Sequence, residues 1–456
     1  MSPITARPLS VQDFPPEIFN VVLDCLDTPT LKSSSLVCKT WWYIARPHLY
    51  SSLIVRGQER LPSFQNLRDQ RPSEVTTYTR RLVIDFLNLR RKTFTNIDTI
   101  ARLVDAVPMM EKLELRHLAL NGPELFTLSS TKPPAPAPAS DARPLSRRPL
   151  RKLGLKTCHS RLTCPSVDPL IGLLALFSSI DDARLDFASQ PDSESSPGQR
   201  WSAISPVPML RIRSLALARW NDTAATLARL APLLPSGHLR ALRCPVRDEK
   251  HAEVLGRFLR QHGPGLEHLS LRTELRRRST FGCPCTRPRV SRSGIGAGPA
   301  LPSAAKLTRH YSRAALEMLP LDACTCLVSF ATYLPRRPPR SMLSHGEQWL
   351  TSTRLAALAA LFPRLPWTVR EVEVHLTGIE EAWPTDRSGV RTDFAPLDDA
   401  MAVDGRAWRV VVRVPVGRAR VEESRELWSV EAFEAQFPKL RDEEALEVRL
   451  YDPSDV

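Results

Sequence analysis

Two pairs of cysteines are the residues of this chain whose type and spacing best suit metal chemistry. Cys283 and Cys285 form one Cys-x-Cys pair, Cys324 and Cys326 form a second, and His310 lies between them. Four thiolates can hold zinc, but short zinc loops usually place two residues between their cysteines. Here 38 residues separate the pairs, and the second pair adjoins a predicted strand, where thiols pack as small apolar groups. We therefore predict no metal site and no bound cofactor.

Motifs of the common catalytic classes are absent from the sequence. It contains no Gly-x-Ser-x-Gly elbow, no His-Glu-x-x-His pair and no phosphate-binding P-loop. The glycine run at 294–298 follows no predicted strand and precedes Pro299 and Pro302, which favours a flexible loop over a dinucleotide-binding turn. The histidines accompany no partner motif. These observations favour a non-catalytic protein.

Arginines gather in one polar stretch. Residues 272–313 contain ten basic side chains and a single acidic one, Glu274. Guanidinium groups bind carboxylates and phosphates through paired hydrogen bonds, so an acidic or phosphorylated ligand fits this stretch, although a solvated loop is the simpler interpretation. Nucleic acid is disfavoured, because Phe281 is the one aromatic residue between 272 and 292 that could stack on a base. The candidate residues are Arg276, Arg277, Arg278, Arg287, Arg289 and Arg292.

The segment from Phe14 to Tyr50 contains more apolar side chains than it can bury by itself. Proline at 15 and 16 is typical of a helix start, Pro29 ends that helix, and Thr30 is placed to cap the next one. Helical spacing of apolar residues predicts three short helices. Segments under about 40 residues seldom fold alone, so these helices must cover their apolar faces against the rest of the chain or a partner.

This segment resembles the F-box family. The family pattern fits without a gap, with Phe14 where leucine is usual, and it covers under a tenth of the chain. The matching residues are Pro15, Glu17, Ile18, Val22, Leu26, Pro29, Leu31, Val37, Cys38, Lys39 and Trp41.

The resemblance implies that these helices dock on the Skp adaptor and, through it, on a cullin. An ordinary helical hairpin and a helix-turn-helix DNA reader are the alternatives, and the second is disfavoured because the segment is formally neutral. The residues implied in adaptor binding are Phe14, Pro15, Pro16, Glu17, Ile18, Val22, Leu26, Leu31, Leu36, Val37, Cys38, Lys39 and Trp41.

After this segment, one short pattern recurs, with apolar residues at its first, fourth and sixth positions. The last two positions alternate, which places both on one face of a strand. The pattern resembles an irregular leucine-rich repeat, with a mixed α/β domain as the alternative. The central residues of the copies are Leu82, Leu113, Leu153, Ala183, Leu215, Leu242, Leu269, Val328 and Val372.

Helices and loops are expected between these strands. Return helices are predicted at residues 97–107, 169–178, 222–234, 250–262 and 352–361. Stretches rich in proline, arginine, glycine and serine cannot pack and are predicted to be disordered insertions. They fall at about 130–149, 189–200, 276–306 and 335–341.

The carboxyl-terminal stretch is acidic, with 20 acidic and 12 basic residues from 370 to 456, although the whole chain has a net charge of +14. Residues 408–416 and 446–450 are predicted strands, with a helix at 422–437 between them. Pro415 predicts that its strand lies at a sheet edge. Repeat arrays need atypical end units, so this stretch is interpreted as a cap.

Composition supports a soluble protein inside the cell, in the cytoplasm, the nucleus or both. The nine cysteines accompany no secretory signal, and the longest apolar run, at 170–177, is too short to span a membrane. The predicted fold class is α/β. The predicted order is a flexible 1–12, a three-helix F-box at 13–56, a leucine-rich-repeat-like solenoid at 57–375 and an acidic cap at 376–456.

These features together predict the substrate-recognition subunit of a Skp–cullin–F-box ubiquitin ligase, with an unknown protein as its substrate. Two other functions stay open at this point. One is an F-box scaffold without a ligase role, and the other is a repeat protein that binds nucleic acid or an acidic ligand through its arginine-rich loop.

Overall fold

The computed structural model describes most of the predicted elements of the chain. It covers residues 15–57, 77–86, 94–121, 147–161, 169–190, 209–218, 223–273, 315–334, 355–376, 394–402, 406–415 and 430–451, with a few isolated positions between 60 and 70. The flexible 1–12, Phe14, Cys283, Cys285, His310, the six arginines from Arg276 to Arg292 and the insertions at 276–306 and 335–341 lie outside these residues. The chain forms two compact units, Met1–Leu210 and Arg211–Val456, which we call the amino-terminal and carboxyl-terminal units.

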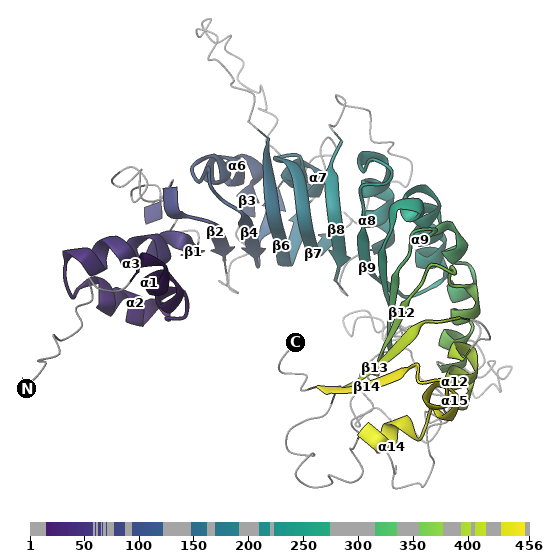
Figure 1. The fold of residues 1–456 in the computed structure, drawn as a ribbon. Helices are drawn as coiled ribbons and strands as arrows, with labels where there is room; N and C mark the ends of the chain where they lie inside the picture. Colours follow the sequence, from purple (N-terminus) through teal and green to yellow (C-terminus); the bar gives the residue numbers. More distant parts are fainter. Residues whose placement is uncertain are drawn as a thin grey trace, which may run out of the picture. The chain divides into compact units, whose positions relative to one another are not determined.

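Three helices open the amino-terminal unit: α1 (Pro16–Asp24), α2 (Thr28–Ser35) and α3 (Lys39–Ser51) (Figure 1). The prediction of three short helices is confirmed. The cap of α2 differs from the expected one, because the Asp27 side chain accepts a hydrogen bond of 2.9 Å from the backbone N–H of Thr30. Pro29 therefore lies in the first turn of α2, where a missing N–H costs nothing, and it does not end α1.

A small core joins the three helices. Leu23, Leu31 and Ala45 are buried between them. Phe19 and Trp41 meet edge to face, with their ring centroids 5.5 Å apart. These contacts come from all three helices, so the segment has an interior of its own although it is short.

The amino-terminal unit continues into a parallel sheet. Its main strands follow the chain in order: β1 (Ser52–Arg56), β2 (Arg81–Asp85), β4 (Lys112–Arg116), β6 (Arg148–Arg161) and β7 (Phe177–Gln190). Two short strands, β3 (Phe94–Asn96) and β5 (Ala119–Asn121), pair with each other, and β5 pairs with β6. The helices between strands are α6 (Ile97–Asp105) and α7 (Pro169–Leu174).

The first strand follows α3 without a loop and lies inside the predicted F-box range of 13–56. Ser51 O accepts a hydrogen bond from the Arg80 N–H, and Tyr50 O accepts one from the Thr79 hydroxyl. Ser52 then pairs with Arg81 at the start of β2. The helical segment is thus joined to the sheet by continuous backbone pairing.

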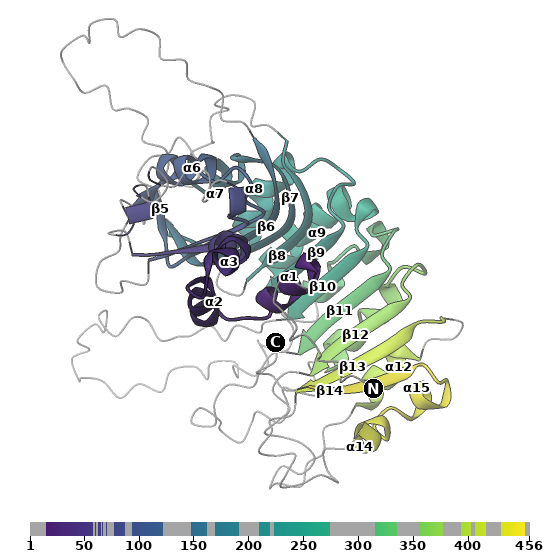
Figure 2. The same ribbon diagram turned by 60° about the vertical axis from the view of Figure 1, so that its left-hand side comes forward.

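The carboxyl-terminal unit contains a second series of parallel strands (Figure 2). In order they are β8 (Arg211–Leu217), β9 (Ala241–Val246), β10 (His268–Thr273), β11 (Ser329–Leu334), β12 (Glu371–Leu376), β13 (Arg409–Pro415) and β14 (Leu446–Tyr451). Its α-helices include α8 (Thr223–Leu230), α9 (Glu249–His262), α12 (Ala395–Met401), α14 (Val430–Glu434) and α15 (Pro438–Asp442), and residues 315–317 and 355–359 are helical as well. Short 3₁₀ turns also connect the strands: η3 (Ala231–Leu233), η4 (Gly263–Gly265), η6 (Leu321–Ala323) and η8 (Phe362–Arg364).

The repeated apolar pattern forms rows of buried side chains across the strands of each unit. In the amino-terminal unit, Leu82, Leu113 and Leu153 are register partners on adjacent strands, and all are buried. In the carboxyl-terminal unit, the corresponding row is Leu242, Leu269, Phe330, Val372 and Val410. The pattern therefore predicted strands correctly, although register shows that Phe330, and not Val328, is the central residue of its copy.

Successive strands also begin with the same hydrogen-bond arrangement. The carbonyl oxygen of Arg80 accepts hydrogen bonds from the N–H groups of Glu111 and Lys112. The same arrangement, one carbonyl receiving two consecutive N–H groups, recurs at Glu111, Arg240, Glu267 and Val328. This repetition fixes the start of each strand relative to the one before it.

Some predicted boundaries and one predicted position were wrong. The strand of Pro415 is internal, because β13 lies between β12 and β14, and the proline is tolerated because it is the strand's last residue. Strand β6 begins within the predicted insertion 130–149, and β7 extends into the insertion predicted at 189–200. The described part of the predicted helix 422–437 contains only the five residues of α14 as helix.

Candidate functional site

Six large apolar side chains of the helical segment face solvent. Their exposed fractions lie between 47% and 83%, and Leu36 is the most exposed. They come from α1, from the turn between α2 and α3, and from α3 itself. The six residues, which we call the exposed apolar set, are Ile18, Val21, Val22, Leu36, Val37 and Tyr43.

Local structure holds these side chains outward. On α1, Ile18, Val21 and Val22 have the i, i+3, i+4 spacing of one helix stripe, whereas Leu23 turns inward and is fully buried. At the end of α2, the N–H groups of Leu36 and Val37 donate to the carbonyls of two serines in its last turn, at 3.1 and 3.2 Å. The turn that displays these two side chains is therefore hydrogen-bonded.

A polar bridge holds α1 against α3. One ring nitrogen of His48 lies 2.8 Å from the Asp24 carboxylate, and the other lies 3.1 Å from the side-chain oxygen of Asn20. Because His48 is near the end of α3 and its partners are on α1, the bridge fixes the angle between the two helices. It keeps the α1 stripe in place relative to the rest of the segment.

The residues predicted to contact the adaptor divide into surface and interior positions. Leu31 is only 6% exposed, so it belongs to the core of the segment and its own surface is not available to a partner. Leu26 and Trp41 are half-buried. Phe14 lies outside the described residues, and Pro16 begins α1. The exposed members are Pro15, Glu17, Ile18, Val22, Leu36, Val37, Cys38 and Lys39.

Val21 and Tyr43 belong to the exposed apolar set but were not among the predicted contact residues. Val21 could have been found from its spacing, since it lies three residues after Ile18 and one before Val22. The sequence gives no such indication for Tyr43, because the apolar residues before and after it in α3 already form a stripe with helical spacing that does not include it.

The cysteine pairs are only partly within the described residues. Burial raises the pKa of the Cys324 thiol to about 12, so this thiol stays protonated at neutral pH, whereas Cys326 is exposed. Within the ranges that the structure describes, no three histidine, cysteine, aspartate or glutamate side chains lie close enough to hold a metal ion. Also within those ranges, no helix has both the length and the apolar character needed to cross a bilayer.

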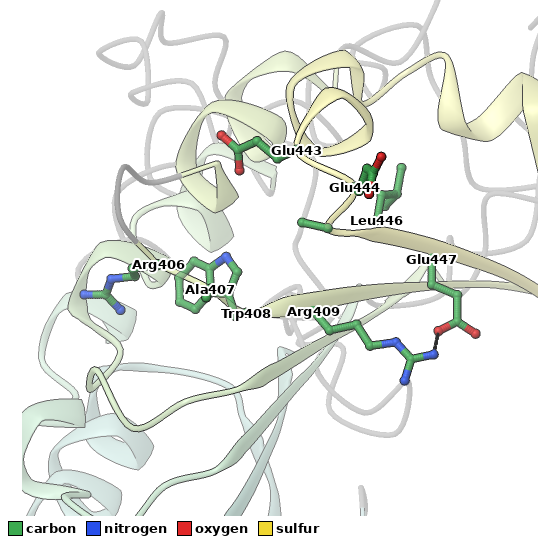
Figure 3. A pocket seen from close by; sticks show the side chains of 9 residues that line it. Arg406, Ala407, Trp408, Arg409, Glu443, Glu444, Leu446 and Glu447 are labelled. Atoms are coloured by element: carbon green, nitrogen blue, oxygen red, sulfur yellow. Dashed lines mark hydrogen bonds and ion pairs between the residues drawn. The ribbon is translucent and has the colours of Figure 1, made fainter.

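A shallow pocket of about 630 Å³ lies beside the start of β13 and β14 (Figure 3). Charged side chains of both signs line it, and Arg409 is ion-paired with Glu447. At its border, the guanidinium carbon of Arg406 lies 4.6 Å from the centroid of the Trp367 ring and 5.0 Å from that of the Trp408 ring. Arg406 also donates to the carbonyls of Pro363 and Leu365, so its main role is to hold this end of the unit together.

A stacked aromatic pair lies on the other face of the carboxyl-terminal sheet from its buried row. The rings of Tyr333 on β11 and His375 on β12 are 3.9 Å apart and inclined by 15°. Burial lowers the pKa of His375 to about 4, and the positive charges of Arg243 and Arg272 act in the same direction. Glu373 lies 3.3 Å from His375, but it is also ion-paired with Arg413, which offsets its charge.

This low pKa predicts acid sensitivity in the carboxyl-terminal unit. An unfolded histidine has a pKa of about 6.5, whereas His375 in the folded chain has a pKa of about 4. Between these two pH values, His375 is protonated in the unfolded chain and neutral in the folded chain, so a fall in pH favours unfolding. The stabilising contribution is therefore complete above about pH 6.5 and is lost as the pH falls to about 4, by at most about 3 kcal/mol. His375→Phe, which keeps a ring for stacking, should flatten this decline in urea unfolding between pH 7 and pH 4. The control His268→Phe, at an exposed position on β10, should leave it unchanged, and equal slopes for all three chains would contradict the assignment.

Comparison with known families identifies the helical segment. The model of the F-box domain matches residues 11–41. An F-box domain is therefore present, and the resemblance drawn from the sequence is confirmed for this part of the chain. No curated protein matched the chain. The F-box domain suggests a role in binding the adaptor of Skp–cullin–F-box ubiquitin ligases, and the leucine-rich-repeat resemblance of the later strands stays a prediction.

Proposed function

We propose that this chain is the substrate-recognition subunit of a Skp–cullin–F-box ubiquitin ligase. The observation that supports it most directly is the exposed apolar set on the helical segment. A folded segment with a core of its own still leaves six large apolar side chains in water, and exposed apolar side chains in such number on a short segment favour an interaction surface. The F-box match at residues 11–41 supports the Skp adaptor as the partner, and a cullin as the partner reached through it.

The exposed apolar set would form the centre of the interface with the adaptor. A standard protein interface buries about 1,600 Å² in total, shared between the two partners. Large apolar side chains near the centre of such an interface supply most of its binding energy. Leu36 and Val37 stand together on the turn between α2 and α3, so we assign them to this central position.

The parallel strands that follow would form the substrate-binding part, as a leucine-rich-repeat-like solenoid. Three features support this: parallel strands in chain order, rows of buried residues in register, and one hydrogen-bond arrangement repeated at the strand starts. The chain itself would take no part in the chemistry. It would act by proximity, raising the local concentration of a protein substrate near the ubiquitin-loaded enzyme. The expected location is the cytoplasm, the nucleus or both.

The two rival functions would use different surfaces or partners of the chain. An F-box scaffold would use the same helical surface to hold the adaptor but would deliver no substrate. A nucleic-acid or acidic-ligand protein would use the arginines from Arg276 to Arg292, which lie outside the described residues. The exposed apolar set favours an adaptor-bound protein over the second rival, because phosphate binding does not require it.

Co-purification of the full chain with the Skp adaptor and cullin tests the proposal. We expect both partners in stoichiometric amounts, and we expect a chain lacking residues 1–51 to retain neither. Adaptor recovered without cullin would favour the scaffold, and no adaptor at all would contradict both F-box functions. Proteins whose ubiquitination depends on the full chain, identified by mass spectrometry, would then be the candidate substrates.

A further inference from the structure

The carboxyl-terminal unit ends in a strand that has a neighbour on one side only. Strand β14 is the last in the order of the sheet and pairs with β13 (Figure 2). Among the strands that the structure describes, none lies along its other side, which we call the free edge. Because a free edge presents a row of backbone N–H and C=O groups, it can pair with a strand of another chain.

The register of β14 shows which backbone groups face the free edge. The Val410 N–H donates to the Ala445 carbonyl oxygen at 2.8 Å, and Val410 is the register partner of Leu446. In a parallel ladder, residues whose backbone groups bond to one neighbour alternate with residues whose groups point the other way. The N–H and C=O groups of Leu446, Val448 and Leu450 therefore point away from β13. Within the described residues, the structure gives these groups no hydrogen-bond partner.

The side chains along β14 have a symmetric order centred on Val448. From 446 to 450 the sequence is Leu-Glu-Val-Arg-Leu. Val448 is 8% exposed and the two leucines are half-buried, so these three belong to the face packed on helices. Because side chains alternate along a strand, Glu447 and Arg449 lie on the other face. They are ion-paired with each other, and Glu447 is also paired with Arg409 of β13 (Figure 3).

This order makes β14 complementary to a second copy of itself. An antiparallel pair with its two-fold axis at Val448 places Leu446 opposite the partner's Leu450 and Glu447 opposite the partner's Arg449, and each contact recurs across the axis. The residues with outward backbone groups then face one another and exchange about six hydrogen bonds. Glu447 and Arg449 fall at positions without backbone bonds, where opposed side chains are closest.

The other ways of joining two free edges fit less well. If the axis moves by one residue, Glu447 faces the partner's Glu447, or Arg449 faces the partner's Arg449, and like charges directly opposite are destabilising. Parallel pairing would turn one copy over, because the free edge lies on a fixed side of the strand. The charged face of one copy would then adjoin the helix-covered face of the other. The register centred on Val448 is therefore the complementary one.

We propose that β14 is a self-association edge through which two copies of this chain pair their β14 strands antiparallel about Val448. The paired copies form one continuous sheet, with the helices of both on the same face. Charged side chains on an edge strand discourage pairing with unrelated strands. Here the two opposite charges match only a strand with the reverse order, which the second copy supplies. A single strand pair is a small interface, so the dimer is weak.

The dimer goes beyond the proposed function and does not depend on it. If the chain is a substrate receptor, a dimer has two helical segments and two substrate-binding regions. A substrate with two recognised segments would then be held more tightly than by either region alone, because the second contact is intramolecular. That consequence rests on the proposed function, whereas the pairing of β14 is a property of the chain.

Sedimentation equilibrium of the full chain over a range of concentrations tests the pairing. We expect the mean mass to rise from one chain to two, with a dissociation constant on the order of 10 µM. Glu447→Arg places arginines opposite one another and Arg449→Glu places glutamates opposite one another, so each variant should dimerise at least about tenfold more weakly. An equal mixture of the two variants should recover the dimer, because arginines of one chain then face glutamates of the other at both positions.

The mixture also controls for misfolding, because a chain that had lost its fold could not recover the dimer. Arg257→Glu is the matched control: it makes the same change of charge at an exposed position of α9 in the same unit, and it should dimerise like the unmodified chain. The chain with Leu36→Asp and Val37→Asp should dimerise as well. Its failure to do so would assign the self-association to the helical segment.

Hydrogen exchange resolved to single amides locates the contact. Raising the concentration should slow exchange at Leu446, Val448 and Leu450, whose amides face the free edge. Exchange at Glu447 and Arg449 should change little, because their amides already bond to β13. This alternation is specific to strand pairing, since contact through side chains alone would not protect every second amide.

Three results would overturn the inference: the mass of one chain at every concentration, a dimer that both charge reversals leave unchanged, or a mixture that stays monomeric. Pairing of the free edge with a strand of a different protein, with no dimer of this chain, would overturn it too. Failure of the unmodified chain to capture the Skp adaptor would instead contradict the proposed function and leave the dimer standing. The two failures are therefore distinguishable.

Discussion

A chain with Leu36→Asp and Val37→Asp is expected to bind the Skp adaptor at least about 100-fold more weakly than the unmodified chain. Each apolar side chain contributes about 1.5–3 kcal/mol when it is fully buried, and every 1.4 kcal/mol is tenfold in affinity. Both side chains are exposed in the free chain, at 83% and 68%, so aspartate at these positions is solvated and leaves the fold intact. In the complex, the same carboxylates would lose water without gaining a partner, which makes the loss larger.

The measurement is titration of the purified adaptor against each chain by calorimetry. Met318→Asp is the matched control, because Met318 is also an exposed apolar residue, at 45%, but lies in the carboxyl-terminal unit. This control should bind the adaptor like the unmodified chain. Unaltered affinity in the Leu36/Val37 variant, with unaltered circular dichroism, would show that the adaptor uses another surface. A similar loss in the Met318 variant would point to a general effect of added charge.

Replacement of Leu31 tests the core of the helical segment and not its surface. The family pattern includes Leu31 among its apolar positions, and a sequence pattern alone cannot distinguish a side chain that holds the helices together from one that meets a partner. The structure separates the two, because Leu31 is buried whereas Leu36 and Val37 are not. A loss of binding on Leu31→Ala would therefore reflect loosened helices and would not locate the interface.

Strands were the most predictable part of the fold. The spacing of residues such as Leu113 and Leu115 has a period of two, and buried parallel strands need that period on their inner face. The helical segment was predictable for a similar reason, from the spacing of its apolar residues. Local hydrogen bonding was harder, and the capping role of Asp27 was missed because a threonine three residues later also fits a cap.

The stacked pair of Tyr333 and His375, with Arg243 near it, could not be predicted in the same way. Arg243, Tyr333 and His375 are far apart in the sequence, and only the pairing of β9 to β12 brings them together. Each follows or precedes a buried residue of the repeated pattern, so aligning the copies on Phe330 instead of Val328 would have placed Tyr333 beside His375. The error of two residues in one weak copy concealed this relation, because the irregular spacing of the copies gives no independent check on register.

Pro415 also shows that strand neighbours cannot be predicted from a single residue of the sequence. A proline cannot donate to the ladder, so an edge strand was a reasonable expectation. Whether a strand has a neighbour, however, depends on residues that come later, here Leu446–Tyr451. Pro415 does stand at the end of its strand, as the rule for proline allows, but the strand itself does not lie at the edge of the sheet.

The buried carboxylate of Asp398 provides the prediction with the largest expected effect on stability. Its two oxygens accept hydrogen bonds from the backbone N–H groups of Lys439 and Leu440, at 3.0 and 3.2 Å, at the start of α15. Asp398 itself belongs to α12, so these bonds join two helices of the predicted cap. Asp398→Ala would leave the N–H groups without an acceptor, and we expect a loss of about 3 kcal/mol in the free energy of unfolding. Asp398→Asn keeps one acceptor oxygen and places its NH2 group against the other N–H, so it should lose about 2 kcal/mol.

The neighbouring aspartate supplies the control for this prediction. Asp399 is exposed and lies 3.2 Å from the Lys439 ammonium group, so Asp399→Ala removes only a surface ion pair and should cost under about 1 kcal/mol. Urea unfolding gives the free energies, and hydrogen exchange of residues 394–402 and 438–442 reports where the chain loosens. If the cap protects the end of the sheet, exchange in Asp398→Ala should also accelerate in β14 and then β13, while β9 and β10 stay protected. Equal stability of the Asp398 and Asp399 variants would mean that the buried carboxylate does not hold the cap, because the two residues differ chiefly in burial.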